Sequence, residues 1–174
     1  MKPNKELSKH CQLCDHKLFN ITEGTKCGLT NEYPNFKNKC SNILLNEECD
    51  AKIKEINIDV FKTNGKKNLA YLNLVVFLIV TVAVFYYSIF LELVALEKGV
   101  FAFLPVFIFI SGLGFLGLAF KPLLSYRQEK KVNDKKKKDL DATMALYNKE
   151  YDIDITFDKD VHGNKTYHSE IKMY

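Results

Sequence analysis

Apolar and polar positions divide the 174-residue chain into three unlike parts. Residues 69–90 and 100–120 contain no charged side chain, whereas the segments before and after them are polar. Each apolar stretch reaches the length of about 20 residues that a helix needs to cross the hydrocarbon core of a bilayer. Two buried helices of a soluble core would need a larger soluble protein around them. The pattern therefore predicts transmembrane helices over 69–92 and 100–120, joined by a tight turn at 97–99.

The spacing of apolar residues changes after the second predicted span. A helical period predicts that a basic juxtamembrane helix continues over 121–149. Apolar and polar residues then alternate over 150–174, on both sides of a loop at Gly163-Asn164, which predicts a β-hairpin with one apolar face. An isolated hairpin is marginal in water, so this face is expected to pack on the preceding helix, the N-terminal module, a second copy or another protein. The candidate partner surface comprises Tyr151, Ile153, Ile155, Phe157, Ile171 and Met173.

The two predicted spans hold few polar groups. Asn73 and Glu92 lie near opposite ends of the first span, and no charge occupies the centre of either, so the spans are interpreted as an anchor. A patch of small residues in the second span would let two helices approach closely, and packing against the first span is favoured over a seam between two copies. Ser111, Gly114 and Gly117 recur every three residues and share one face. The whole patch comprises Ser111, Gly112, Gly114, Gly117 and Ala119.

Lysine and arginine gather beside the outer ends of both spans, in a chain of formal net charge +4. Because these residues favour the cytoplasmic side of a membrane, both termini are predicted to be cytoplasmic. The cluster after the second span is also predicted to contact anionic lipid headgroups. It lacks the interleaved aromatic residues of a base-stacking platform, so no nucleic acid is expected as a partner. The predicted headgroup contacts are Lys121, Arg127, Lys130, Lys131, Lys135, Lys136, Lys137 and Lys138.

Four cysteines in the segment 1–45 have a spacing typical of metal ligands. Cys11, Cys14, Cys27 and Cys40 follow the pattern C-x2-C-x12-C-x12-C. The segment is too short and polar to build a core of its own. A reducing cytoplasm also disfavours disulfides. The pattern therefore predicts a structural Zn²⁺ held by four thiolates, with no open coordination position for catalysis.

Other residues near this cluster leave alternatives open. Cys49 lies in a predicted helical linker, 46–68, and is either a further metal or redox thiol or a small packing residue. His10 and His16 flank the first cysteine pair and are possible substitute ligands. An iron–sulfur cluster would use the same four thiolates. Gly28 is expected to adopt a positive φ in a second turn beside the site.

Four short motifs run through the first 50 residues: C-x2-C at 11–14, G-x2-C-x-L-T at 24–30, P-x-F at 34–36, and the final Cys40. Together they resemble a four-cysteine module at the N-termini of small uncharacterised bacterial integral-membrane proteins, over about residues 10–50. The resemblance implies a zinc-ribbon-like fold and a bacterial inner (cytoplasmic) membrane as the location. It implies no activity.

The sequence contains no recognisable set of catalytic residues and no phosphate- or dinucleotide-binding motif, so an enzyme is not expected. The predicted fold is a mainly α membrane protein. A two-helix transmembrane hairpin joins a small zinc-ribbon-like module to a C-terminal cytosolic helix and β-hairpin. The leading hypothesis is a membrane-anchored cytosolic adaptor that contacts an unknown protein or a second copy. The alternatives are a redox- or metal-responsive membrane sensor and a small oligomeric channel or membrane effector.

Overall fold

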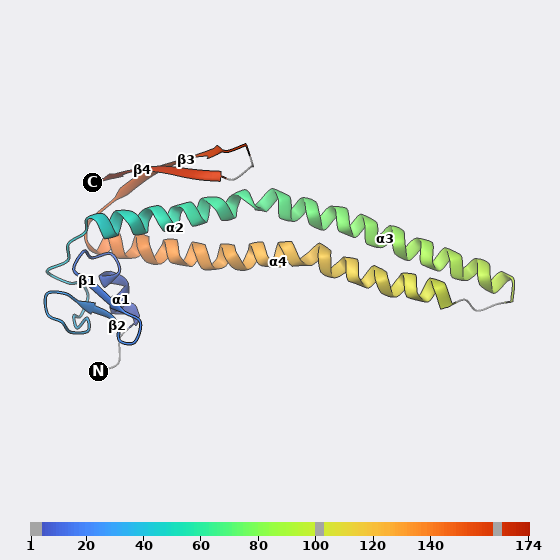
Figure 1. Cartoon of the computed structure of the whole chain (residues 1–174), viewed down its shortest axis with the longest axis horizontal. Coiled ribbons are helices and arrows are strands. Elements are labelled where there is room, and N and C mark those ends of the chain that lie inside the picture. The colour runs from blue at the N-terminus through green and yellow to red at the C-terminus, as the bar shows by residue number, and fades with distance from the viewer. Residues whose placement is uncertain (1–4, 100–102, 162–164) are drawn as a thin grey trace. The chain divides into compact units, whose positions relative to one another are not determined.

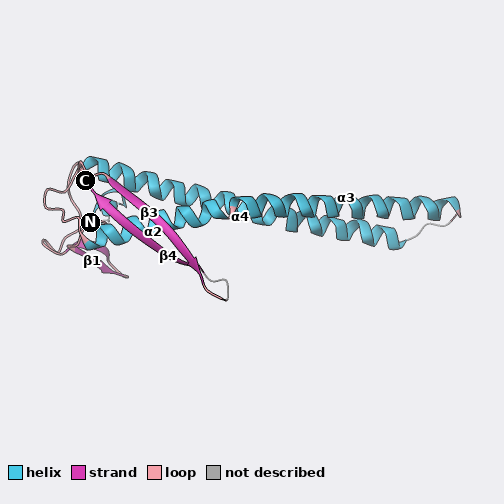
Figure 2. Ribbon diagram, turned by 90° about the horizontal axis from the view of Figure 1, so that it is seen from above, coloured by secondary structure: helices cyan, strands magenta, loops and turns pink. Residues whose placement is uncertain are grey.

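The computed structural model describes residues 5–99, 103–161 and 165–174, which are mostly helical (Figures 1 and 2). Two long apolar helices and a C-terminal β-hairpin confirm these parts of the predicted fold. The expected loop at Gly163-Asn164 lies outside the described residues. The elements are α1 (Lys5–Cys11), β1 (Lys17–Asn20), β2 (Gly24–Cys27), α2 (Glu47–Gly65), α3 (Lys67–Glu97), α4 (Phe103–Leu146), β3 (Tyr151–Lys159) and β4 (Lys165–Met173).

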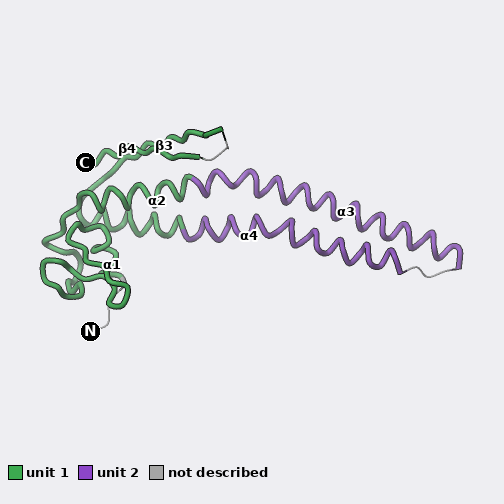
Figure 3. Tube along the Cα trace, viewed as in Figure 1, with its two compact units in different colours: residues 1–61, 133–174 green, residues 62–132 purple. Residues whose placement is uncertain are grey.

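The chain forms two compact units, which Figure 3 distinguishes by colour. The first unit combines residues 1–61 with residues 133–174, so it is built from both ends of the chain. The second unit consists of residues 62–132 and contains both apolar stretches. The polar segments on either side of the apolar helices therefore fold together.

In the second unit, the apolar parts of α3 and α4 are largely uncovered by the rest of the protein. Of their most apolar stretches, 11% and 17% of the residues are buried. A helix that is apolar all round is normally buried, either in a large core or in a membrane. Both helices are long and apolar enough to span a membrane. At the end of α3, the amide of Gly99, whose φ is 73°, donates to the carbonyl of Leu96, as at many helix C-termini.

The small residues of α4 do not all serve the same contact. A Cβ on Gly112 would lie 2.4 Å from the ring of Phe85 in α3, so this glycine permits close packing of the two helices. Ala119 is also buried. A Cβ on Gly114 or Gly117 would meet no atom within 4 Å. The expectation that the whole patch packs against the first apolar helix is therefore wrong for these two glycines.

Pro122 lies inside α4, where its ring nitrogen has no hydrogen to donate. In a regular helix the residue at position 122 would donate to the carbonyl of Leu118, four residues earlier. The Nδ2 of Asn73 in α3 donates to this carbonyl instead, at 3.1 Å. Asn73, a strongly polar residue in an apolar helix, thus replaces the hydrogen bond that proline removes.

In the first unit, the N-terminal module is a short helix followed by a two-stranded antiparallel sheet. The strands β1 and β2 pair from Lys17 opposite Cys27 to Asn20 opposite Gly24. The turn between them uses Gly24 at a φ of 81°, a conformation that glycine adopts without steric cost. The side chain of Asp15 accepts a hydrogen bond from the amide of Glu48 at 3.0 Å, so the module caps the N-terminus of α2.

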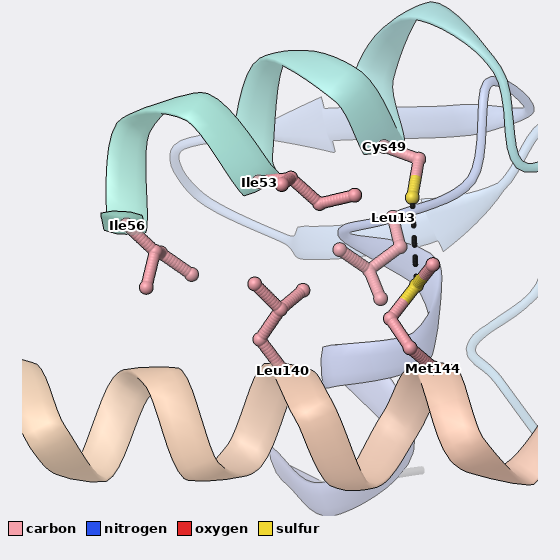
Figure 4. Packing of buried hydrophobic residues seen from close by; sticks show 6 residues of the cluster. All are labelled: Leu13, Cys49, Ile53, Ile56, Leu140 and Met144. Atoms are coloured by element: carbon pink, nitrogen blue, oxygen red, sulfur yellow. Dashed lines mark hydrogen bonds between the residues drawn. The ribbon is translucent and has the colours of Figure 1, made fainter. Parts of the chain in front are cut away.

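Residues from both ends of the chain form the core of this unit (Figure 4). Leu13 of the module lies between α2 and the last turns of α4, and its side chain is 4% exposed. Burying a leucine stabilises a fold by about 1.5–3 kcal/mol, which makes Leu13 a main link between the module and the helices. The six residues of the core cluster are Leu13, Cys49, Ile53, Ile56, Leu140 and Met144.

The hairpin β3–β4 pairs from Tyr151 opposite Met173 to Lys159 opposite Lys165. Its apolar face lies against the chain's own helices. Tyr151, Ile153 and Ile171 pack on the core cluster. Near the far end of the strands, the rings of Phe157 and Tyr167 each lie 6.2 Å from Phe61 of α2. The contacts therefore include the preceding helix α4, as one alternative expected, but also α2, which was not among the partners that the sequence suggested.

Candidate metal centre

Cys11, Cys14, Cys27 and Cys40 line one cavity of about 20 Å³. Cys11 is the last residue of α1, and the amide of Cys14 donates back to the Cys11 carbonyl at 3.2 Å, so one tight turn presents both thiols. Cys27 ends β2, and Cys40 lies in the loop that leads to α2. The four predicted ligands therefore come from separate local structures and meet around one small space.

Gly28, which follows Cys27, differs from its expected role. It is not among the described residues with positive φ; in this turn Asn31 has that conformation, with a φ of 57°. The amide of Gly28 donates to the carbonyl of His16 at 2.7 Å. A Cβ on Gly28 would lie 2.8 Å from that carbonyl oxygen. Glycine is needed here because two backbone segments approach closely, and not because of an unusual φ.

The surroundings of the cavity suit thiolates bound to a cation. The amide of Leu44 points at the sulfur of Cys14, with a nitrogen–sulfur distance of 3.5 Å, which is a common support for metal-bound thiolates. Burial, together with a smaller effect of the nearby thiols of Cys27, Cys40 and Cys14, raises the pKa of the Cys11 thiol to about 11. A bound cation would counter both effects because it favours the thiolate.

Within the described ranges, no three or more His, Cys, Asp or Glu side chains form a group that could hold a metal ion. The four thiols are therefore not arranged as a closed ligand set. Four cysteines around one cavity nevertheless match the donors of a tetrahedral structural zinc site. A volume of about 20 Å³ is close to that needed for one water molecule. Zinc stays a prediction.

His10 and His16 also border the cavity. The ring of His10 is held in place by Tyr147, which directly follows the end of α4. Its Nδ1 lies 2.9 Å from the Tyr147 hydroxyl, and the same hydroxyl accepts a hydrogen bond from the amide of Cys40 at 3.0 Å. Phe36, from the P-x-F motif, packs edge-on against His10 at 5.3 Å between ring centres. Burial lowers the pKa of His10, which favours its neutral form.

Tyr147 is the functional side chain that sequence reasoning missed. Its helical spacing places it among the apolar residues of the last helix, and nothing in that pattern shows that its hydroxyl reaches a cysteine loop more than 100 residues away. A tyrosine in place of phenylalanine in the apolar series Leu140, Met144 and Tyr147 is the one available signal, because a partly buried phenol usually needs a hydrogen-bond partner.

Cys49 does not line the cavity. It is 0% exposed within the core cluster, and its sulfur lies 3.7 Å from the sulfur of Met144 (Figure 4). Burial raises the pKa of its thiol to about 11. Of the two interpretations of Cys49, this placement favours a small packing residue over a further metal or redox thiol.

The basic residues predicted to contact lipid headgroups differ in their surroundings. Lys121, Arg127, Lys131, Lys135 and Lys138 are exposed. The other three lysines contact side chains of α2, so their charged groups interact with the protein itself. These contacts are Lys130 to Asn64 at 3.3 Å, Lys136 to Asp59 at 3.9 Å and Lys137 to Asn57 at 2.7 Å.

The predicted partner surface on the hairpin is half covered by the chain itself, because Tyr151, Ile153 and Ile171 pack on the core while Phe157 and Met173 keep 40% and 36% exposure. A different apolar group is more open. It lies on the cysteine module, and sequence reasoning did not single it out, although apolar residues in a polar segment are a visible signal. The exposed apolar residues of the module are Leu18, Phe19, Ile21 and Leu29, with exposed fractions of 51%, 68%, 92% and 56%.

Comparisons of the chain with protein-family models, with curated proteins and with solved structures find no match.

Proposed function

We propose that this protein is a membrane-anchored adaptor, in which a zinc-stabilised module on the cytoplasmic side presents an apolar surface to another protein. The observation that carries the proposal is the composition of the first unit. Residues 1–61 and 133–174 form one unit with a shared core, and the two apolar stretches lie in the chain between them.

This composition supports a two-pass anchor. If α3 and α4 cross a membrane, the segments before and after them can share a core only when both lie on the same side. An even number of spans meets that condition. The lysines beside the outer ends of the spans favour the cytoplasm for this side. The resemblance of residues 10–50 to a bacterial module favours the inner membrane.

Zinc at the cysteine cavity is a separate part of the proposal. Purified full-length chain is expected to contain about one zinc per molecule by elemental analysis. Cys27→Ser should lose the metal, whereas Cys49→Val, which changes a thiol outside the cavity, should retain it. Metal retention in Cys27→Ser would contradict the ligand assignment. If the purified chain instead contains iron and shows the visible absorption of an iron–sulfur cluster, the cofactor is that cluster and not zinc.

The adaptor role is supported by the exposed apolar residues of the module, because side chains that the rest of the chain leaves uncovered are available to another protein. The test is purification of the full chain in mild detergent, followed by identification of co-purifying proteins. Phe19→Ser combined with Ile21→Ser should release a partner that the parent chain retains. Val161→Ser is the matched control, since Val161 is 99% exposed but lies outside the cysteine module. A chain that is monomeric and free of other proteins would count against an adaptor.

The sensor alternative has less support. It assigns Cys49 as the thiol that exchanges with the site under oxidation, and a fully buried thiol with a raised pKa is a poor nucleophile. Zinc content before and after mild peroxide treatment distinguishes the two functions, because an adaptor should keep its zinc.

A further inference from the structure

A shallow groove of about 500 Å³ follows the exposed side of α4 at the end of its apolar stretch. All of its lining residues belong to the second unit. Gly117 and Phe120 form the apolar part, and Leu124 continues it. Three polar side chains, Lys121, Ser125 and Gln128, line the same groove.

The groove is open because Gly117 has no side chain. A Cβ at this position would meet no atom within 4 Å, so neither α3 nor any other described residue fills the space. Helical side chains lean toward the N-terminus, which directs the stem of Lys121 over Gly117, one turn earlier. A flexible cation is thereby placed at the border between an apolar surface and a polar one.

Lys121 is available to an anion. The side chain is exposed, and no ion pair within the described residues involves it. Ser125 and Gln128 lie four and seven residues further along the helix, and therefore on the same face. The Ser125 hydroxyl donates to the carboxylate of Glu129 at 3.3 Å, so Lys121 and the Gln128 amide are the groups left for an anion. An apolar surface that ends in a cation and an amide donor matches the chemistry of one ligand class, which has an acyl chain attached to a phosphate.

We propose that this groove binds one anionic phospholipid from the membrane. The acyl chain lies over Gly117 and Phe120, and the phosphate binds Lys121. The proposal depends on the proposed membrane anchor, because only a membrane presents such a lipid at the end of an apolar helix. It adds a specific lipid site to the general attraction between basic residues and headgroups.

A second copy of the chain is a less suitable occupant. Two α4 helices that crossed symmetrically at Gly117 would bring one Lys121 close to the other at the edge of an apolar contact. Like charges repel most strongly where water is scarce. A phosphate neutralises the same lysine, so charge complementarity favours the lipid.

The test uses the full chain purified in detergent and incubated with mixed micelles that contain dioleoyl phosphatidylglycerol or dioleoyl phosphatidylcholine. Bound lipid is counted by native mass spectrometry. The parent chain is expected to retain one phosphatidylglycerol in preference to phosphatidylcholine. Gly117→Leu fills the groove and should abolish this retention. Lys121→Gln removes the cation and should reduce retention about fivefold, the effect of one basic residue near an anionic surface.

Two variants serve as matched controls. Gly114→Leu adds the same side chain at another open glycine of α4 that does not line the groove. Arg127→Gln removes another exposed charge that does not line the groove. Both should bind phosphatidylglycerol like the parent chain.

The outcomes separate this proposal from the anchor on which it depends. If alkaline carbonate releases the parent chain from membranes, the membrane anchor and the lipid site are both refuted. If the chain resists extraction but all variants retain lipid equally, the groove proposal alone is wrong. A dimer that Gly117→Leu dissociates would make the second copy the occupant and would overturn the lipid site.

Discussion

The pairing of Asn73 with Pro122 predicts a coupled effect of two substitutions. Asn73→Leu removes the donor to the Leu118 carbonyl, which has lost its normal partner because residue 122 is proline. An unsatisfied carbonyl in apolar surroundings costs about 1–3 kcal/mol. Asn73→Leu should therefore destabilise the helix pair by about this amount, even though leucine suits an apolar helix better than asparagine.

Pro122→Ala changes the expected result. Alanine at position 122 restores a backbone amide that can donate to the Leu118 carbonyl, and removing an interior proline gains up to about 3 kcal/mol. In this background Asn73 is no longer needed, so Asn73→Leu should be neutral or stabilising. The two substitutions should show a coupling energy of about 1 kcal/mol or more.

The measurement is reversible unfolding of the four full-length chains in mixed detergent micelles, titrated with sodium dodecyl sulfate. Near-ultraviolet circular dichroism of tyrosine is a suitable signal, since the chain has 9 tyrosines and no tryptophan. An equal cost of Asn73→Leu in both backgrounds would refute the reasoning, because it would show that Asn73 acts independently of the proline.

Four further predictions follow from single contacts. Leu13→Ala should destabilise the first unit by about 2–5 kcal/mol in denaturant titrations, because the side chain is a buried link in the core. Gly112→Ala should cost about 1–3 kcal/mol in detergent unfolding, since the new Cβ meets the ring of Phe85. Glu92→Leu should stabilise the helix pair by at least about 1 kcal/mol in the same assay, because both carboxylate oxygens are buried without a partner among the described residues. The lowered pKa of His10 means that the unfolded chain binds this proton more readily, so stability should fall as pH drops below 6.5, and His10→Gln should flatten that slope.

The sequence predicted the features that depend on local periodicity. The two charge-free stretches form long apolar helices, and the alternation after residue 150 forms the hairpin β3–β4. Both signals are repeated over many residues, so single exceptions do not hide them. The cysteine spacing predicted a site, and the structure brings those four residues to one cavity.

The features that the sequence did not reveal depend on contacts between distant residues. Nothing near Tyr147 indicates that its hydroxyl supports Cys40, and nothing near Asn73 indicates a proline in another helix. Gly28 shows a related difficulty. A glycine in a turn suggests a positive φ, but here the constraint is the His16 carbonyl on a neighbouring segment. Such roles become visible only when the chain is folded.

The shared core of the first unit also has a consequence for the order of synthesis. Leu13 and Cys49 leave the ribosome long before Leu140 and Met144, so the cysteine module cannot complete its packing until these later residues have been synthesised. An early metal ion would hold the module together during this interval. If α3 and α4 span a membrane, as proposed, a chain in which either helix fails to insert would leave the two halves of the core on opposite sides of it. Assembly of the first unit would then depend on the correct topology of both helices.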